Sequence, residues 1–550
     1  MTMETKTCKN CSANFTITPD DVAFYEKIKV PAPTWCPECR LKRRLAQRNE
    51  RSLYKRTCDL CGASIIAMYS PNKPYKVYCP PCWYSDKWEA LDYGRDYDLN
   101  RPFFDQLKDL QIAVPQISLL VENVVDSPWV NYEVDAKNCY LNFGGGNNED
   151  GAYNHYNLKT KDSFDNFWFM RGEYGYENIL CENSYKTFYS IFSYDCRDTY
   201  ASFDCRNCSN VIGCTGLRHK QYHIFNQPVS KEDYEKFATE YLSGSYQKLQ
   251  ELLKKSHEFW KTKPQRAIFV EKSANALGHI ISESRNVSDA LSIEKTENSK
   301  HVLYTLQVKD SYDTSSVWQG ELLYEFLGGY KVSNSKCCTG ILNDASELEY
   351  SHLLIGSNHC FGSMNLRSKS YCILNKQYSK EEYATLKAKI IGNMKSRGEY
   401  GEFFPPSFSM FSYDETIAHE WFPMKKEEAI SGGWNWDEHE STQYEFSDYH
   451  IPDSIQDVGD DILQQTLKCE QSGKAYRIIP MELAFYRRFG IPIPRRAPFP
   501  RHHQRLSFIS QHRTLRPRTC GNCHQSIESV YSEEEFPIVY CEACYQKEIV

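Results

Sequence analysis

Short strand-like units recur at regular intervals through the middle of the chain. In the second half they lie 11–13 residues apart, near Ser288, Ser299, Asp310, Leu322, Ser335, Glu347, Asn358 and Ser370. In the first half they are less even, near Asn138, Tyr153, Asp162, Glu177, Tyr185, Thr199, Asn207 and Gln221. Two units together make about 23 residues, which is close to one coil of a parallel β-solenoid. The pattern therefore predicts a solenoid, and antiparallel sandwiches in 131–228 and 286–375 would contradict it.

The solenoid region is itself duplicated. LRHKQYHIFNQPVSKEDY (217–234) overlays LRSKSYCILNKQYSKEEY (366–383) at an offset of 149 residues. KDSFD (161–165) overlays KDSYD (309–313) at an offset of 148. We expect two copies, either continuous or abutting.

Three helices are predicted around these copies. Each copy ends in Ser-Lys-Glu, a helix start signal, so helices should cover about 230–262 and 379–396. Another should cover 101–112, with Asn100 as cap and Pro102 in the first turn. Its apolar face would hold Phe103, Phe104, Leu107 and Leu110. Residues 397–468 are rich in Pro and aromatic residues and read as an irregular connector.

Composition favours a globular protein with bound metal. Hydrophobic residues make up 41% and charged residues 25% of the 550. No stretch approaches 18 apolar residues, and the N-terminus lacks an apolar signal segment, so a cytoplasmic location is expected. In a reducing compartment, 23 cysteines favour metal ligation over disulfides.

Twelve of these cysteines form six CxxC knuckles. The paired knuckles are Cys8/Cys11 with Cys36/Cys39, Cys58/Cys61 with Cys79/Cys82, and Cys520/Cys523 with Cys541/Cys544. Two knuckles complete a tetrahedral four-thiolate zinc site with no open position, so three structural Zn²⁺ ions per chain are expected. Helix-like sequence follows each second knuckle, as in treble-clef and zinc-ribbon domains.

A fourth copy has lost its ligands. Residues 8–45, shifted by 461, overlay 469–506 without a gap, so that Cys8 meets Cys469 while Ser472, Ala497 and Pro500 replace the other ligands. Shifted by 462, the second ribbon overlays the third zinc site. We expect a double ribbon at each end of the chain, with a metal-free member that is folded.

Positive charge is concentrated in the ribbons. Net charge is −7 overall, but residues 40–56 carry +7 and residues 487–518 carry +9. Such segregation favours a polyanionic partner. The predicted phosphate contacts are Arg40, Lys42, Arg43, Arg44, Arg48, Arg487, Arg488, Arg495, Arg496, Arg501 and Arg505. Trp83, Tyr84 and Trp88 could stack on unpaired bases. A non-catalytic nucleic-acid-binding function is the first expectation, with RNA or a ribonucleoprotein ahead of DNA.

Other interpretations remain open. Basic residues could neutralise the zinc thiolates, or dock on an acidic partner or the acidic middle of the chain itself. The solenoid could be a protein-binding scaffold. An enzyme acting on carbohydrate or nucleic acid rests only on fold analogy, because no catalytic motif is present. The ligand, the oligomeric state and any reaction stay open.

Two further motifs have alternative interpretations. Cys196, Cys205, Cys208 and Cys214 could bind a further metal ion, although buried stacking is the simpler interpretation. GGGNNEDG (144–151) could hold calcium but fits a solenoid turn better.

The expected fold is therefore mainly β: a central duplicated parallel β-solenoid flanked at both ends by treble-clef or zinc-ribbon domains, with a few connecting helices. The expected domains are ribbons at 1–57 and 58–98, a helical linker at 99–130, solenoid copies at 131–228 and 286–378, a helical connector at 229–285, a helix and irregular connector at 379–468, the metal-free ribbon at 469–518 and the third zinc ribbon at 519–550.

Two resemblances agree with this layout. The first site resembles the small bacterial "probable zinc-ribbon" domain in CKNC, Phe15, AFY (23–25) and CPECR (36–40). Nearly the whole chain resembles uncharacterised multi-zinc-ribbon proteins of small-genome, candidate-phyla bacteria. The matching stretches are YCPPCWYSDKWEALDYGRDYDLNRPFF (78–104), GEYGEFFPPSFSMFSYDETIAHEWFP (398–423) and CEQSGKAYRIIPMELAFYRR (469–488). The resemblance implies the domain layout and no activity.

Overall fold

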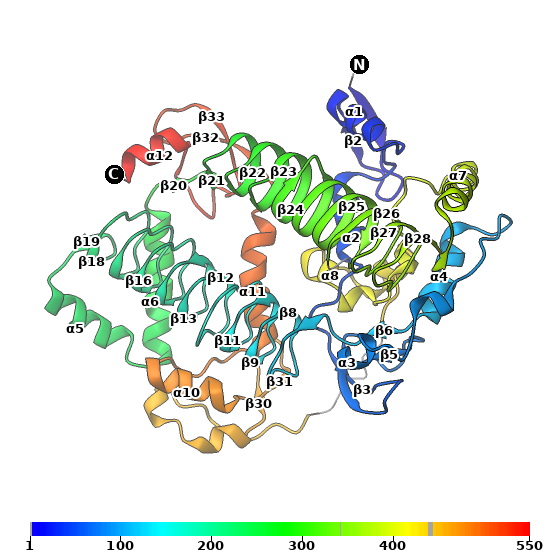
Figure 1. Ribbon diagram of the computed structural model, residues 1–550. Helices are drawn as coiled ribbons and strands as arrows, with labels where there is room; N and C mark the ends of the chain where they lie inside the picture. Colours follow the sequence, from blue (N-terminus) through cyan, green and yellow to red (C-terminus); the bar gives the residue numbers. More distant parts are fainter. Residues whose placement is uncertain (1–2, 341–342, 438–443, 550) are drawn as a thin grey trace. The chain divides into compact units, whose positions relative to one another are not determined.

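A computed structural model describes residues 3–340, 343–437 and 444–549. Strands outnumber helices, and the chain divides into two compact units (Figure 1). Unit 1 comprises Met1–Leu119 and Phe269–Glu438, and unit 2 comprises Leu120–Ile268 and His439–Val550. Each unit thus joins ribbons from one end of the chain to the repeated region that is more distant in sequence.

Unit 2 contains a parallel strand array, which we name ladder 1 (residues 121–228). Each strand pairs with the segment twelve residues further on, as in the register of Thr187 with Thr199 and of Thr199 with Val211. Isolated parallel bridges continue this spacing between the strands. The strands are β7 (Val121–Glu122), β8 (Asn131–Val134), β9 (Lys137–Tyr140), β10 (Phe143–Gly146), β11 (Glu149–Ala152), β12 (Phe167–Met170), β13 (Glu173–Tyr176), β14 (Ile179–Glu182), β15 (Tyr185–Phe188), β16 (Arg197–Tyr200), β17 (Ser209–Ile212), β18 (Gln221–Ile224) and β19 (Gln227–Pro228).

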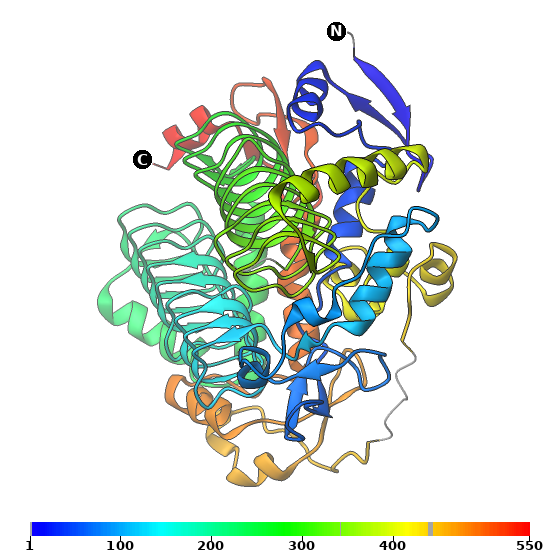
Figure 2. The ribbon, with the colours of Figure 1, turned by 45° about the vertical axis from the view of Figure 1, so that its right-hand side comes forward.

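Unit 1 contains the second copy, ladder 2 (residues 270–377), a nine-stranded sheet in sequence order. Its strands are β21 (Val270–Glu271), β22 (Ala274–Ser282), β23 (Arg285–Glu294), β24 (Glu297–Lys309), β25 (Tyr312–Thr339), β26 (Ala345–Glu349), β27 (Asn358–Phe361), β28 (Ser370–Ile373) and β29 (Lys376–Gln377). Val302 pairs with Thr314, again twelve residues away. Figure 2 shows both arrays as stacked rungs. One rung is the stretch of about twelve residues between a strand position and its partner in the next strand. The expected coil of about 23 residues is wrong, because the parallel neighbour lies only twelve residues away.

A three-residue period underlies each rung. From Tyr132 to Phe225, and again from Glu283 to Gly340, every third residue has a positive φ. This conformation is disfavoured for residues with a β-carbon, least so for Asn and Asp, and most for β-branched ones. Ile280 is the only Val, Ile or Thr with positive φ among the described residues. Each rung therefore consists of four three-residue segments, and this twelve-residue rung is the unit that recurs every 11–13 residues in the sequence.

The side chain after each positive-φ residue faces the ladder interior, and many of these side chains are small and polar, although ladder 2 also has a buried aliphatic cluster there that includes Val287, Ile293 and Val302. The oxygens of the polar side chains accept backbone N–H groups one rung further on, as Ser190 Oγ does from Ser202 at 3.3 Å. Asn154, Asn166 and Asn178 also bond one another along the interior, at 3.0–3.1 Å. These bonds satisfy buried backbone donors that a purely aliphatic interior would leave unpaired.

Both ladders end in the same way. Phe225–Asn226 and Leu374–Asn375 have positive φ and turn the chain into β19 and β29, which pair antiparallel with the last strand of each ladder. Ser230 and Ser379 then cap α5 (Lys231–Tyr241) and α7 (Lys380–Ser396). The hairpins cover the terminal strand edges, which would otherwise be open to further pairing.

The helix starts are confirmed, with two differences. The predicted helix 230–262 is broken: α5 ends at Tyr241 and α6 (Tyr246–Lys261) begins after Gly244, whose φ is +96°. Helix α4 (Phe103–Ala113) has Pro102, and not Asn100, at its cap position. Ladder 2 also begins at Val270, earlier than the expected residue 286.

Four ribbons flank the ladders, two in each unit. Unit 1 holds β1 (Glu4–Thr7), β2 (Asn14–Ile17), α1 (Pro19–Lys27) and α2 (Pro37–Leu45), then β3 (Tyr54–Thr57), β4 (Ser64–Ala67), β5 (Val77–Tyr78) and α3 (Pro80–Trp83). Unit 2 holds β30 (Leu467–Lys468), β31 (Ala475–Tyr476), α10 (Pro480–Phe489) and α11 (Pro498–Gln511), then β32 (Arg516–Thr519), β33 (Ser526–Ser529), β34 (Val539–Tyr540) and α12 (Glu542–Glu548).

Short elements join these parts. Strand β6 (Gln116–Ile117) pairs with β5 in unit 1, and β20 (Gln265–Arg266) pairs with β34 in unit 2. The connectors carry η1 (Ala90–Tyr93), η2 (Pro406–Phe408), η3 (Tyr413–Glu415), α8 (Ile417–Trp421), α9 (Lys426–Ser431), η4 (Ile455–Asp457) and η5 (Asp460–Gln464).

Candidate metal centres and the ribbon–ladder interfaces

The three sets of four cysteines come together as predicted. Within each set the four sulfur atoms lie within 4.8 Å of one another. In the first set, one pair follows β1 and the other lies at the start of α2, where Cys36 is the N-cap. Cys79 and Cys541 cap α3 and α12 in the same manner. Four convergent thiols make each set suitable for a divalent metal ion in a closed tetrahedral site.

Backbone N–H groups prepare one thiol of each set for ligation. Cys8 Sγ accepts the N–H of Cys36 at 3.2 Å. Burial raises the pKa of Cys8, but N–H donors from Cys36, Cys11 and Asn10 outweigh it and lower the pKa to about 6. The pKa of Cys58 and that of Cys520 are lowered to about 6 by equivalent donors. A thiolate, the form that binds metal, is therefore accessible near neutral pH.

The fourth ribbon keeps the knuckle backbone without the ligands. Cys469 N–H donates to Lys474 O at 2.9 Å and Glu470 N–H donates to Arg495 O at 3.1 Å. In the first ribbon the same two bonds join Cys8 to Ala13 and Lys9 to Thr34, at 2.9 and 3.0 Å. Ala497 takes the N-cap place of Cys36, at the start of α11. This ribbon thus folds in the same way although its ligand set is incomplete.

Arginines of α2 are buried against ladder 2. Arg40 and Arg44 contact Asp313 at 2.9 and 3.0 Å. Arg43 and Arg44 contact Glu325 at 2.9 and 3.0 Å. Burial raises the pKa of Asp313, but the charges of Arg40 and Arg44 outweigh it and lower this pKa well below its usual range. The cluster is thus a fully paired set of charges inside unit 1.

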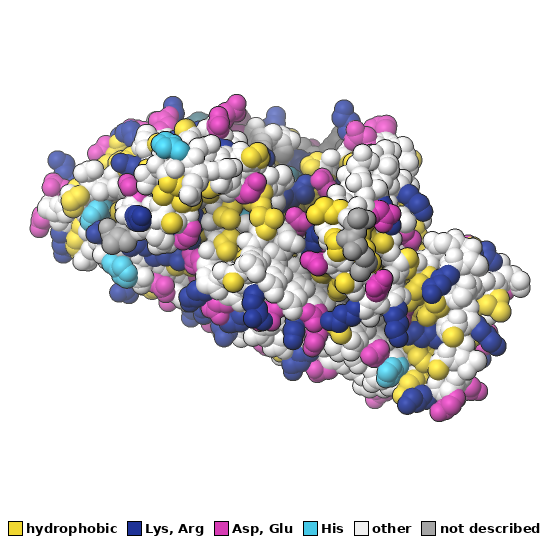
Figure 3. All heavy atoms as spheres, turned by 90° about the horizontal axis from the view of Figure 1, so that it is seen from above, with side chains coloured by type: hydrophobic (Ala, Val, Ile, Leu, Met, Phe, Trp, Pro, Cys, Tyr) yellow, Lys and Arg dark blue, Asp and Glu magenta, His cyan; other side chains and the backbone are white. Residues whose placement is uncertain are grey.

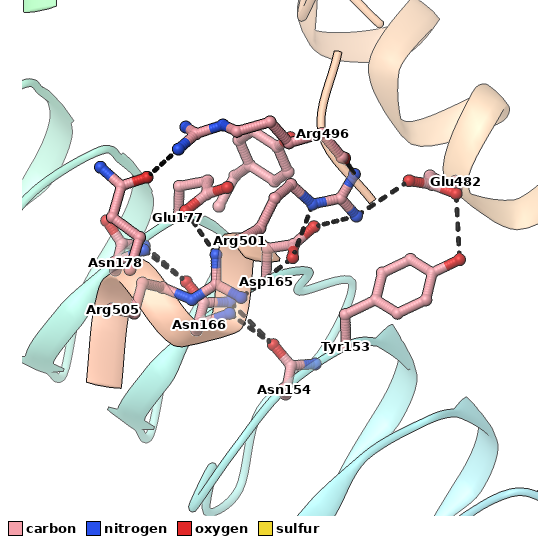
Figure 4. Close-up of polar contacts among 12 residues, drawn as sticks. Tyr153, Asn154, Asp165, Asn166, Glu177, Asn178, Glu482, Arg496, Arg501 and Arg505 are labelled. Carbon is pink, nitrogen blue, oxygen red and sulfur yellow. Dashed lines mark hydrogen bonds and ion pairs between the residues drawn. The ribbon is translucent and has the colours of Figure 1, made fainter. Parts of the chain in front are cut away.

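Arginines of α11 make an equivalent cluster with ladder 1 (Figure 4). Arg501 contacts Asp165 at 2.8 Å and Glu482 at 3.3 Å. Arg505 contacts Asp165 at 3.0 Å and pairs with Glu177. Both arginines are about 2% exposed or less, so neither guanidinium reaches solvent.

The two clusters are copies of one interface. Asp165 and Glu177, shifted by 148, are Asp313 and Glu325, and Arg501 and Arg505 correspond to Arg40 and Arg44 by the shift of 461. Surrounding contacts are also repeated. Phe24 stacks on Tyr312 with ring centres 3.9 Å apart, and Phe485 packs on Phe164 at 4.5 Å. Lys27 pairs with Asp310 at 3.1 Å, and Arg488 with Asp162 at 3.9 Å. The same contacts therefore join ribbon to ladder in both units.

The sequence left open that the basic residues dock on the acidic middle of the chain, but it did not identify the individual acidic partners. Asp165 and Asp313 are the last residues of the duplicated segments KDSFD and KDSYD. The repeat that revealed the duplication therefore also contained the aspartate that pairs with the arginines.

The structure gives the predicted phosphate contacts other roles. Six of the eleven side chains are buried: Arg40, Arg43, Arg44, Arg48, Arg501 and Arg505. Arg48 pairs with Glu50 at 2.6 Å. A phosphate group could reach these six only if the ribbons detached, so in this structure they hold the protein together.

The other five basic residues are also engaged. Lys42 lies over the Phe422 ring, and Arg487 contacts Asp460 at 2.6 Å. Arg488 donates to Tyr174 Oη at 2.8 Å. Arg495 donates to Pro452 O at 2.8 Å and Arg496 to Gln504 Oε1 at 2.5 Å. Arg487 and Arg488 are the exposed members of the set.

The predicted base-stacking residues are mostly internal. Trp83 and Trp88 are buried and Arg367 of ladder 2 lies over both rings, whereas Tyr84 is 45% exposed. The second ribbon thus uses its tryptophans to pack on ladder 2.

The remaining candidate motifs belong to the ladder. Cys196, Cys205, Cys208 and Cys214 form a buried cluster, and each thiol donates to the carbonyl two residues before it. Their sulfurs form no convergent set among the described residues. The segment 144–151 supplies the end of β10 and most of β11. Both segments thus lie within the stacked strands and turns of ladder 1.

Comparisons with known proteins add little. Among the described residues, no helix is long and apolar enough to cross a membrane. No protein-family model matches the chain, and no curated protein matches it. A solved structure described as "putative acetyltransferase from Desulfovibrio desulfuricans G20" is similar at 12% identity over 48% of this chain and 71% of that one, with a TM-score of 0.11. At that score the likeness carries no argument about fold or activity.

Proposed function

We propose that this protein is a non-catalytic binding scaffold, in which zinc-loaded ribbons clamp two parallel β-solenoids with twelve residues per coil. The observation that carries the proposal is the use of the ribbon arginines. Because Arg40, Arg44, Arg501 and Arg505 are buried in ion pairs with the ladders, the ribbons act as clamps. The surface left for a partner is the uncovered side of each ladder.

That surface is regular and carries both charges. In ladder 1 an exposed column runs along successive rungs: Asp135, Asn147, Lys159, Arg171, Asn183, Asp195, Asn207 and His219. The corresponding column of ladder 2 is Glu283, Lys295, Gln307, Gln319 and Lys331. Figure 3 shows basic and acidic side chains interspersed on one face of the molecule.

A second column makes the charge pattern clearer. Lys137, Glu149, Lys161 and Glu173 alternate in sign, and Arg285, Glu297, Lys309 and Glu321 repeat the alternation in ladder 2. Lys137 contacts Glu149 at 2.9 Å and Arg285 contacts Glu297 at 3.2 Å. A face that neutralises itself suits a protein partner better than a nucleic acid, whose affinity depends on uncompensated positive charge.

Nucleic-acid titration tests this choice. RNA and duplex DNA at low salt should bind negligibly, whereas a photo-crosslinker placed at Asn183 or Gln319 should capture a partner protein that one at Arg488 does not. Salt-dependent binding of RNA by the intact chain would favour the nucleic-acid function instead, with Arg487 and Arg488 as the exposed cations.

Zinc loading is tested separately. Elemental analysis of protein purified without added metal should give three zinc ions per chain, one for each complete set of cysteines. A value near two or four would show that a site is wrongly assigned.

A further inference from the structure

The protein contains the same clamp twice, once with a metal site and once without. In unit 1, Cys36 caps α2 and Cys39 directly precedes Arg40. Any metal held by these thiols fixes the first turn of the nine-residue helix that carries Arg40, Arg43 and Arg44. The position of the guanidinium groups over Asp313 and Glu325 is thus tied to the first metal site.

The clamp of unit 2 is held by other means. Helix α11 has 14 residues, and its added length buries Ile509. The loop before it buries Ile491 and Ile493, and Tyr476 Oη donates to Pro494 O at 2.7 Å. Pro500, which stands where the first ribbon has the ligand Cys39, restricts the unfolded chain and so favours the folded start of α11. These contacts do not depend on an ion.

We propose that zinc at the first site gates the acidic face of ladder 2, whereas the equivalent face of ladder 1 is closed permanently. The inference rests on the zinc loading proposed above. Loss of the ion removes a large part of the folding free energy of a small ribbon. Ribbon 1 (residues 1–57) then releases Asp313 and Glu325, while Arg501 and Arg505 stay on Asp165 and Glu177.

The gated face has a defined chemistry. Asp313 and Glu325 have fully buried carboxylates beneath α2, beside Tyr312 and Tyr324. Once uncovered they form an anionic and aromatic surface, because two carboxylates would lose their three arginine partners. The ligand class that this surface fits is an arginine-bearing helix, since α2 is such a helix and occupies it in the closed state.

Carboxyl footprinting tests the gate with an internal control. A Cys8→Ser/Cys36→Ser variant and a Cys469→Ser variant are labelled with a water-soluble carbodiimide and an amine, and labelling is read by mass spectrometry. In Cys8→Ser/Cys36→Ser, Asp313 and Glu325 should label at least about tenfold faster than in the unchanged chain, as expected for local opening. Asp165 and Glu177 should be unchanged. Cys469→Ser should alter neither pair, because that ribbon holds no ion.

Metal content of the same samples separates the two proposals. Three zinc ions in the unchanged chain and two in Cys8→Ser/Cys36→Ser, with Asp313 still protected, would overturn the gate but leave zinc loading intact. Equal labelling of both ladders would overturn it too, since it would mean global unfolding. Fewer than three ions in the unchanged chain would contradict the loading itself. If the double variant aggregates, chelator titration of the unchanged chain gives the same readout: Asp313 should label before Asp165, and simultaneous onset would refute the gate.

Discussion

At the scale of single residues, burial decides what an arginine does. Arg487 and Arg505 lie in the same basic segment, yet the Arg487 side chain is 41% exposed and that of Arg505 is 2% exposed. Arg487 pairs with Asp460 in solvent, where an ion pair contributes about 0–1 kcal/mol. Arg505 pairs with Asp165 and Glu177 inside unit 2. Removing one partner of a buried set leaves a charge without compensation.

Arg505→Met should therefore lower the free energy of unfolding of unit 2 by about 3–5 kcal/mol. Arg487→Met, the matched control, should change it by about 1 kcal/mol or less. Hydrogen exchange of ladder 1 amides measures both. Equal effects of the two substitutions would show that the buried cluster contributes no more than a surface pair.

At the scale of elements, a ribbon can keep its fold after it has lost its metal ligands. The knuckle hydrogen bonds of Cys469 and Glu470 match those of Cys8 and Lys9. Burial raises the pKa of Cys469, but the Ser472 side chain and the backbone N–H groups of Ala497, Ser472 and Gln471 outweigh it and lower this pKa. The hydrogen-bonding environment of a metal-binding thiolate is thus kept at one of the four ligand positions. Three substitutions would give this ribbon a complete set of four cysteines.

Ser472→Cys/Ala497→Cys/Pro500→Cys should restore a fourth site. Metal content should rise from three to four ions per chain, because the backbone already places these positions as in the first ribbon. Elemental analysis measures the change, and the same triple variant with Cys469→Ser is the control that should return to three. An unchanged content in the triple variant would mean that the ribbon backbone has diverged.

At the scale of the whole molecule, the chain is built from two homologous units whose ribbons and ladders come from distant parts of the sequence. The first two ribbons share unit 1 with ladder 2, and the last two share unit 2 with ladder 1. The first ribbon and its metal-free copy have 38 residues each and align without a gap. They meet ladder residues that also correspond, so one ribbon should be able to replace the other.

Grafting residues 469–506 in place of residues 8–45 should yield a chain with two metal sites whose ladder 2 stays covered. Arg501 and Arg505 would take the places of Arg40 and Arg44 over Asp313 and Glu325, although Lys300 would meet a glutamate in place of Asp21. Metal analysis and carboxyl footprinting check this result. Rapid labelling of Asp313 in a folded graft would show that the interfaces are not interchangeable.

The local and repetitive features of this protein can be predicted from its sequence. Knuckle spacing predicted the three cysteine sets, because four ligands within a short chain must converge on one ion. Ser-Lys-Glu placed the starts of α5 and α7, because capping depends on neighbours in sequence. The repeat predicted a mainly β structure with duplicated halves.

The number of residues in one rung, the segments that make up each unit and the role of the arginines became known only from the folded structure. A positive φ at every third residue changes the amino-acid composition only slightly, so the sequence did not reveal this period. The twelve-residue unit was therefore interpreted as half of a 23-residue coil, although it is a complete rung. Arg40 and Asp313 are separated by 272 intervening residues, and a basic helix reads alike whether its partner is a phosphate or a buried carboxylate. The sequence gives the sign of each charge, but the partner of that charge is known only once folding has brought distant residues together.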